Sequence, residues 1–266
     1  MESPFFLELK DFLLELGIKF TVEKNLIFFN DIHFMIEAVG LTDKSDVIVN
    51  RAGDSNAVNK YCRIHEDLWH SKGEIIRDII KANLQMGERI FARKCSVVSI
   101  DSQTAKMFFD KHHLLGNTRS KYRYGLIYNG SIVAVAAFSA SRPMKREDIT
   151  LESFEWVRYA SKGATRVSGG MGKLLSHFVN EQKPQEIMSY ADAEWSLGDV
   201  YEKLGFKKTG ATAPVEFLVN KHTYERIPVK KLSKDNKYKS AQFNQDDWVL
   251  LLNSGNFKFI RRFSLL

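Results

Sequence analysis

The chain has 266 residues, a formal net charge of +7 and two cysteines. It exceeds the roughly 100 to 200 residues of a typical single domain, so the sequence predicts two folded units. Cys62 and Cys95 give neither a disulfide framework nor paired metal-ligand spacing, which favours buried thiols in a reducing compartment. No apolar run approaches the roughly 18 residues of a membrane span, and acids interrupt the apolar N-terminal segment, which lacks a signal-peptide pattern. We therefore expect a soluble, cytoplasmic protein with no membrane partner.

The first 86 residues predict a small α/β unit. Apolar residues at helical spacing predict a helix over 3–16, which Gly17 ends. A second helix is expected over 68–84, where Ile75, Ile76, Ile79 and Ile80 form an apolar face. Short strands are expected at 18–23, 25–30, 33–40, 46–50 and 62–67.

The chain from residue 87 predicts a longer alternation of strands and helices. The expected elements are a strand at 89–100, a helix at 101–113 capped by Asp101 or Ser102, a hairpin at 122–140, a strand at 152–160, a glycine-led helix at 166–182, a strand at 186–192, a helix at 197–205 and strands at 206–210 and 214–220. The pair Asn129-Gly130 suits the type I′ turn of the hairpin.

Positive charge gathers after residue 220. From Asn220 to Leu266 there are ten Lys or Arg against four acids, with aromatic residues between them. Such a segment can follow a phosphate backbone while its aromatics stack on bases; the alternative is an ordinary solvated surface. The candidate nucleic-acid contacts in it are Lys230, Lys231, Lys234, Lys237, Lys239, Arg261 and Arg262. The alternating segment 256–263 is expected to close a sheet edge.

The order of elements, with "RVSGGM" and "YEKLGF", resembles the GCN5-related N-acetyltransferase (GNAT) fold. "RVSGGM" fits the family's R/Q-x-x-G-x-G/A pattern at Arg166 and Gly169, but Met171 stands where Gly or Ala is usual, and Gly170 or Gly172 would compensate by a one-residue slip. The resemblance implies acetyl-CoA or another acyl-CoA as cofactor, held by the turn and the following helix N-terminus. Its candidate contacts are Arg166, Ser168, Gly169, Gly170 and Gly172. The alternative is a strand-to-helix turn that holds no anion.

The resemblance also supplies candidate catalytic residues. In GNAT enzymes a tyrosine at the place of Tyr201 protonates the leaving thiolate, and a phenol suits that task because its pKa is well above neutral; the alternative is that Tyr201 only packs. Glu155 and Asp192 are candidate bases, although Glu155 can instead pair with an arginine for structure. His112 and His113 precede the loop segment "LLGN", where they contact substrate or lie on the surface.

A closer resemblance covers most of the chain. "ERIFARKCSVVSID", "FFDKHHLLGN", "MSYADAEWS" and "NSGNFKF" look like a group of phage and mobile-element proteins acting in a bacterial host cell. These join a domain similar to Vsr endonucleases to a GNAT-like domain related to the Mom DNA-modification protein. This implies an α/β fold with a small Vsr-like nuclease-type domain at 1–86, followed by a GNAT-like mixed-sheet domain at 87–266 with a basic extension from about 220.

The nuclease motif is incomplete. A PD-(D/E)xK site needs at least two carboxylates on Mg²⁺ and a lysine, whereas "FMIEAVG" supplies Glu37 alone. We therefore expect the first domain to bind DNA without cutting it. The leading hypothesis is acyl transfer to a nucleic-acid base amine; the alternatives are a non-catalytic DNA-binding or anti-defence protein and an active endonuclease.

Overall fold

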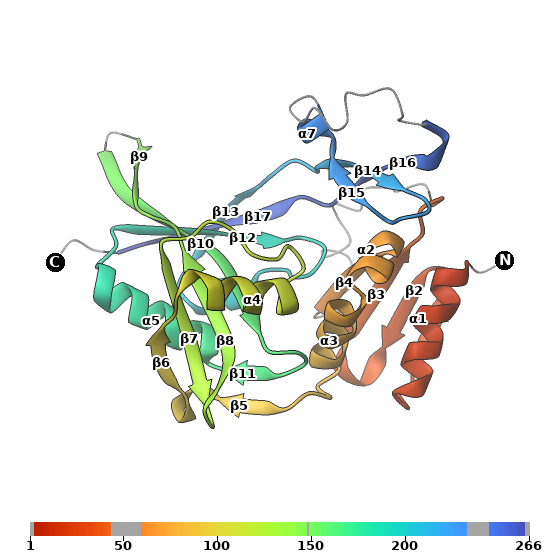
Figure 1. Ribbon diagram of the computed structural model, residues 1–266, viewed down its shortest axis with the longest axis horizontal. Coiled ribbons are helices and arrows are strands. Elements are labelled where there is room, and N and C mark those ends of the chain that lie inside the picture. The colour runs from red at the N-terminus through yellow and green to blue at the C-terminus, as the bar shows by residue number, and fades with distance from the viewer. Residues whose placement is uncertain (1–2, 44–59, 148, 233–244, 264–266) are drawn as a thin grey trace. The chain divides into compact units, whose positions relative to one another are not determined.

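The computed structural model describes residues 3–43, 60–147, 149–232 and 245–263, which form two compact units (Figure 1). Unit 1 contains Met1–Gly73, Ala191–Leu197 and Ala211–Phe257. Unit 2 contains Glu74–Tyr190, Gly198–Gly210 and Lys258–Leu266. Each unit thus draws on three stretches of the chain, whereas the domains expected at 1–86 and 87–266 are continuous in sequence. That division by sequence stays a prediction.

Unit 1 begins with helix α1 (Pro4–Glu15), whose first turn is capped by the Ser3 hydroxyl. Its apolar side contains Phe5, Phe12 and other buried residues, and the rings of Phe5 and Phe12 pack on Trp69 with centroids 6.2 and 5.8 Å away. A four-stranded sheet in the order β1-β2-β3-β4 accompanies it, and β4 runs parallel to β3 while the other pairs are antiparallel. Its strands are β1 (Thr21–Glu23), β2 (Leu26–Phe29), β3 (Phe34–Val39) and β4 (Lys60–His65). The short helices are η1 (Asn30–Ile32) and α2 (Glu66–Ser71).

A second, three-stranded sheet also belongs to unit 1. Its antiparallel strands lie in the order β15-β14-β16, with bounds β14 (Glu216–Asn220), β15 (Arg226–Pro228) and β16 (Trp248–Leu252). Leu41, Val219 and Leu251 form its small core. The short helices here are α7 (Val229–Leu232) and η5 (Gln245–Asp247).

Most of unit 2 is built on a large mixed sheet in the order β13-β17-β12-β10-β8-β7-β6, with β9 paired to β10. The strands are β6 (Ser96–Ser99), β7 (Tyr122–Tyr128), β8 (Ser131–Phe138), β9 (Arg142–Arg146), β10 (Ile149–Ser161), β12 (Glu186–Asp192), β13 (Lys207–Ala211) and β17 (Asn256–Arg262). A separate parallel pair joins β5 (Arg89–Phe91) to β11 (Arg166–Ser168).

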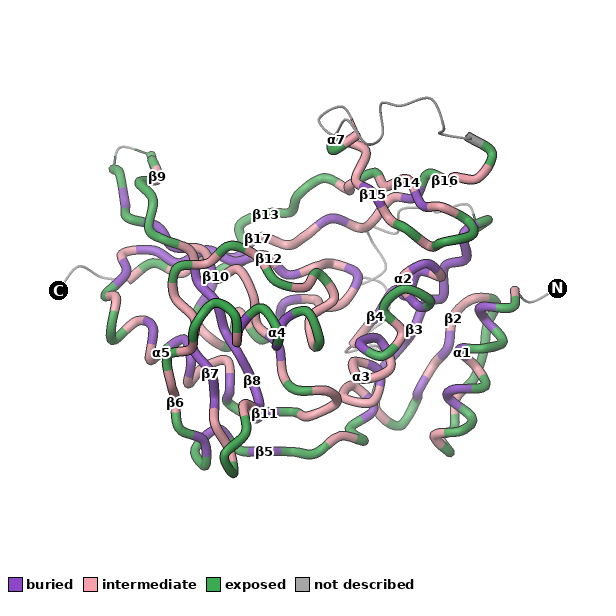
Figure 2. Tube along the Cα trace, in the orientation of Figure 1, coloured by how far each residue is buried: buried purple, intermediate pink, exposed green. Residues whose placement is uncertain are grey.

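Two helices cover opposite faces of the large sheet. Alternate residues of β8 point to opposite faces, so Val135 and Ala137 pack against α4 (Ser102–His112) and Phe138 stacks on Phe178 of α5 (Gly170–Gln182), with ring centroids 3.9 Å apart. β8 is accordingly buried over most of its length (Figure 2). The remaining helices are α3 (Gly73–Asn83), η3 (Ala92–Lys94) and α6 (Asp199–Lys203).

Several local predictions are confirmed. The first helix, the Asp101 cap and the hairpin are present, and Asn129 and Gly130 both have the positive φ that a type I′ turn requires. Cys62 and Cys95 are both buried, free thiols, and burial raises the pKa of Cys62 to about 12.

Other local predictions are wrong. The segment 68–84 is not one helix, because α2 starts earlier, at Glu66, and breaks at Lys72 before α3. The segment 89–100 is not one strand, because η3 separates β5 from β6 and they join different sheets. The segment 256–263 does not close an edge, because β17 lies between β13 and β12 in the large sheet. The strand expected at 46–50 lies outside the described residues.

Candidate functional site

The glycine-led turn of unit 2 begins α5. Gly169 is the N-cap in the left-handed region, with φ 78°, and α5 starts at Gly170. The first intrahelical hydrogen bond runs from Lys173 N to Gly169 O at 3.0 Å. The N–H groups of Gly170, Met171 and Gly172 donate to no acceptor within the described residues. Because the amides at a helix N-terminus attract anions, this turn can hold a phosphate.

The second and third glycines of this turn are tightly enclosed. A Cβ on Gly170 would lie 2.9 Å from the Tyr159 hydroxyl, and a Cβ on Gly172 would lie 3.2 Å from Leu204 Cδ2. The two glycines thus let the start of α5 approach β10 and the end of α6 closely. Of the other predicted cofactor contacts, Arg166 is exposed, and the Ser168 hydroxyl accepts a hydrogen bond from Arg89 Nε at 3.0 Å.

Tyr201 lies among aromatic rings of the same unit. Its ring stacks on Phe259, with centroids 5.0 Å apart, and meets the edge of Trp156 at 6.0 Å. Its hydroxyl is 3.1 Å from the Ser189 hydroxyl, which is also 2.9 Å from the Trp156 carbonyl oxygen. Burial raises the pKa of Tyr201, so the phenol keeps its proton at neutral pH.

The Tyr201 side chain marks the point where two parallel strands part. The pairing of β10 with β12 ends at Trp156 and Ser189, although β10 continues to Ser161 and β12 to Asp192. The neighbouring pairing of β10 with β8 shifts register between Trp156 and Arg158, a bulge of the kind that terminates or redirects pairing.

Glu155 is not brought to Tyr201. Phe154 and Trp156 both point to the face covered by α5, since Phe154 packs against Phe178 with ring centroids 5.2 Å apart. Glu155, between them, points to the opposite face. Its half-buried carboxylate lies 3.6 Å from Arg142, the arginine pairing that the sequence left open as a structural role.

The two predicted loop histidines hold the end of α4. His112 is the last residue of that helix, and its Nδ1 accepts from Gly163 N at 3.2 Å. His113 is the C-cap, and its Nδ1 accepts from Leu115 N at 3.1 Å. Burial, with a smaller effect of Arg158, lowers the pKa of His113 to about 4, so it is neutral at physiological pH. Neither ring presents a positive charge to a phosphate there.

The basic residues predicted to contact nucleic acid differ in their surroundings. Lys230 and Lys231 are exposed on α7. Arg261 donates to Leu204 O at 2.7 Å, and Arg262 lies 3.5 Å from the buried Glu186 carboxylate, so both have structural partners. Lys234, Lys237 and Lys239 lie outside the described residues.

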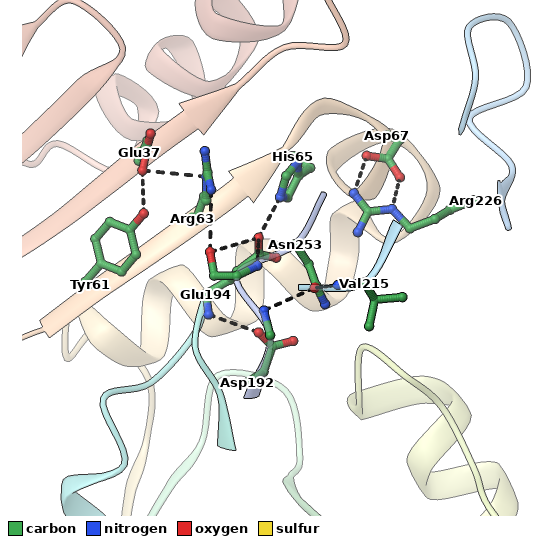
Figure 3. Close-up of polar contacts among 12 residues, drawn as sticks. Glu37, Tyr61, Arg63, His65, Asp67, Asp192, Glu194, Val215, Arg226 and Asn253 are labelled. Carbon is green, nitrogen blue, oxygen red and sulfur yellow. Dashed lines mark hydrogen bonds and ion pairs between the residues drawn. The ribbon is translucent and has the colours of Figure 1, made fainter. Parts of the chain in front are cut away.

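In unit 1 the polar face of β4 carries a cluster that the sequence analysis did not identify (Figure 3). Tyr61, Arg63 and His65 alternate with the buried Cys62 and Ile64. Tyr61 donates a hydrogen bond to Glu37, and Arg63 Nε lies 3.6 Å from the same carboxylate. Glu37, the candidate nuclease carboxylate, is thus held by a phenol and a guanidinium, and burial followed by the charge of Glu37 raises the pKa of Tyr61.

The other half of this cluster joins β4 to segments far along the chain. His65 Nε2 lies 2.9 Å from Glu194 Oε1, and the backbone N–H of Ser254 donates to the same oxygen at 3.1 Å. Burial raises the pKa of Glu194, but the hydrogen bond to His65 and nearby positive charges outweigh it, so the net pKa is low. Arg226 donates to both oxygens of the fully buried Asp67, at 2.6 and 2.8 Å.

Asp192 belongs to this unit 1 cluster. Its Oδ1 accepts from Glu194 N at 2.9 Å, and burial together with the charge of Glu194 raises the pKa of Asp192 to about 6. The period-two spacing of Tyr61, Arg63 and His65 was the sequence signal for a polar strand face. Glu194, the partner of His65, had no such signal, because it lies 129 residues away in sequence.

Metal-binding clusters and membrane-spanning helices are both absent from the described residues. No group of three or more His, Cys, Asp or Glu side chains is placed to hold a metal ion there. None of the helices in those residues is both long and apolar enough to cross a membrane.

Comparisons with known proteins give structural matches only. No protein-family model and no curated protein sequence matches the chain. Among solved structures, a GNAT family acetyltransferase from Elizabethkingia anophelis with acetyl-CoA bound is 14% identical, covers 64% of this chain and 99% of its own, and has a TM-score of 0.36. The ribosomal-protein-S18-alanine N-acetyltransferase from Escherichia coli is 12% identical, covers 65% of this chain and 96% of its own, and has a TM-score of 0.38. Both TM-scores are below 0.5.

Proposed function

We propose that unit 2 is a GNAT-type N-acyltransferase that uses acetyl-CoA or another acyl-CoA. The observation that carries the proposal is the position of Tyr201: a buried, protonated phenol where β10 and β12 part, in the same unit as the glycine turn of α5. The residues fit an acyl-CoA at that turn. Gly169 leaves its backbone exposed, three amides of α5 have no acceptor among the described residues, and the enclosed Gly172 keeps the turn beside α6.

Each candidate residue has a task that its surroundings support. A bound acyl-CoA supplies an activated acyl thioester. The amides of Gly170, Met171 and Gly172 hold phosphate through hydrogen bonds and the helix dipole. Tyr201 donates a proton from its hydroxyl, and its ring is fixed by Phe259 and Trp156. Glu155, on the opposite face of β10, accepts a proton from the attacking amine. Proton donor and acceptor act on different groups, the leaving thiolate and the attacking amine.

Calorimetry with acetyl-CoA tests the cofactor site. The Gly169→Asp variant places a carboxylate where phosphate binds, and its Cβ meets only Ala92 Cβ at 3.7 Å, although any side chain is strained at φ +78°. Gly169→Asn is the matched neutral control. We expect at least about a tenfold loss of affinity for the Asp variant relative to the Asn variant. Equal affinity in the two variants would remove the phosphate role of this turn.

Turnover separates the role of Tyr201 from packing. Tyr201→Phe keeps the ring contacts and should bind acetyl-CoA normally, while the rate falls by roughly 100-fold or more, the usual contribution of a general acid. An unchanged rate would show that Tyr201 only packs.

For the acceptor we propose an exocyclic amine of a nucleic-acid base, as the Mom-like resemblance implies. The support is electrostatic: the net charge of +7 and the exposed Lys230 and Lys231 in unit 1 favour a polyanion. Such an amine is a weak nucleophile, so close positioning and base flipping would be needed. Mass spectrometry of nucleosides from DNA incubated with protein and acetyl-CoA, beside a peptide amine acceptor, distinguishes the two substrate classes.

A second candidate function is DNA binding without chemistry, with unit 1 as a degenerate Vsr-like fold. It is favoured by the engagement of Glu37 with Tyr61 and Arg63, which leaves that carboxylate committed to protein partners. Salt-dependent DNA affinity in a protein that does not bind acetyl-CoA would support it. Mg²⁺-dependent cleavage that Glu37→Ala abolishes would instead support an active endonuclease.

A further inference from the structure

The small β5–β11 sheet of unit 2 has one buried and one exposed face. In its register Arg166 pairs with Arg89, Val167 with Ile90 and Ser168 with Phe91. Ile90 and Val167 are buried. The partners on either side of them therefore share the other face, and Arg89, Phe91 and Arg166 are exposed there.

Cations gather on this face around one aromatic ring. The guanidinium carbons of Arg89 and Arg93 each lie 5.0 Å from the centre of the Phe91 ring, whose residue is 38% exposed. Arg166 stands beside Arg89. Across the described residues, none of these three arginines pairs with a carboxylate. Like charges held this close repel one another unless an anion joins them, so the face is complementary to a ligand that carries phosphate and a flat ring.

Contacts within unit 2 attach this face to the glycine turn. Lys173, in the first turn of α5, donates to the carbonyl oxygens of Ala92, at 3.0 Å, and Cys95. These carbonyls flank Arg93. Arg89 donates to the hydroxyl of Ser168, the residue just before the Gly169 cap. The arginines therefore lie within a few residues of the amides assigned to the pyrophosphate.

We propose that Arg89, Phe91 and Arg93 bind the 3′-phosphoadenosine end of the acyl-CoA donor. The two arginines pair with the 3′-phosphate, and adenine stacks on the Phe91–arginine surface. The inference rests on the proposed acyltransferase function, which it extends to the part of the cofactor away from the thioester. It makes the protein selective for CoA over the same molecule without its 3′-phosphate.

Calorimetry with CoA and 3′-dephospho-CoA tests the assignment without any turnover. The variants are Arg93→Gln and Arg89→Gln/Arg93→Gln. Arg119→Gln is the control, because Arg119 is an exposed arginine of the same unit that belongs to neither β5, η3 nor β11. We expect wild type and the control to bind CoA roughly tenfold tighter than 3′-dephospho-CoA, a preference that is lost in the double variant. Phe91→Ala should weaken both ligands by a similar factor, because stacking does not depend on the phosphate. Urea midpoints equal to wild type confirm folding.

Two results would overturn the inference, and they differ in whether the acyltransferase proposal survives. If CoA binds but the preference is absent, or survives in the double variant, the arginines do not bind the 3′-phosphate and the acyltransferase proposal stands. If neither CoA nor acetyl-CoA binds wild type, both proposals fall. In that case, single-stranded oligonucleotide binding that Arg89→Gln/Arg93→Gln removes would assign this face to nucleic acid.

Discussion

The ion pair between Asp67 and Arg226 is the sharpest test of how unit 1 is held together. Asp67 opens α2 and its side chain is fully buried, while Arg226, 159 residues later, is only 15% exposed. Arg226→Met keeps the length of the side chain but leaves the Asp67 carboxylate buried without its bidentate partner. Removing one member of such a pair costs about 3 to 5 kcal/mol, a range that includes the smaller loss of the Arg226 contact with the Phe217 ring.

Urea denaturation followed by tryptophan fluorescence measures this cost. Three of the four tryptophans, Trp69, Trp195 and Trp248, belong to unit 1 and report its unfolding. The double variant Asp67→Asn/Arg226→Met leaves no unpaired buried charge, so it should be more stable than Arg226→Met alone. The matched control is His222→Ala, which breaks the exposed contact of His222 with Asp247, 3.4 Å apart in the same unit, and should cost about 0.5 kcal/mol or less. A cost below about 1 kcal/mol for Arg226→Met, or strictly additive effects in the double variant, would refute the reasoning.

Three further predictions concern other parts of the chain. The folded-state pKa of Asp192 is raised to about 6, above its ordinary value, so the contribution of Asp192 to stability is lost as pH rises from about 4 to 6. The Asp192→Asn variant should therefore gain about 2 to 3 kcal/mol of unfolding free energy relative to wild type between pH 4 and pH 7. A pH-independent difference in urea midpoints would contradict this. Gly198→Ala should cost roughly 2 to 5 kcal/mol of stability, since φ is +89° and the new Cβ would lie 2.1 Å from Phe259 Cζ. The control Gly130→Ala, with φ +74° and open space around it, should cost about 1 kcal/mol. Equal thermal shifts in the two variants would show that neighbouring atoms move to relieve the Phe259 contact. Ser189→Ala removes the hydroxyl beside Tyr201 and should raise the Tyr201 pKa further, which ultraviolet titration detects; a lowered pKa would place the stabilising partner elsewhere.

Local structure followed closely from local sequence. Ser3 and Asp101 cap helices, Asn129-Gly130 turns the hairpin and Gly169 enters α5, because each depends only on side chains and dihedral angles within a few residues. The same reasoning failed at 68–84 and 89–100. Apolar spacing there continued across Lys72 and η3. Only the fold reveals that one helix ends at Lys72 and that β5 and β6 join different sheets.

The candidate sites divide in the same way. "RVSGGM" and "YEKLGF" marked the turn and Tyr201, since short motifs carry a local geometry. The sequence could not show that Ser189 and Trp156 meet the Tyr201 side chain, or that Glu155 points to the opposite face from Trp156. Those facts depend on which strands pair and where the pairing ends.

What the sequence determined by itself was composition, charge and most local elements, because helix and strand periods and turn chemistry are properties of neighbouring residues. Only the tertiary structure decided the partners of the buried charges. Glu194 meets His65 and Asp67 meets Arg226, over separations of 129 and 159 residues. A charged side chain withdrawn from water must find a partner, and chain folding, rather than sequence proximity, determines which partner is within reach.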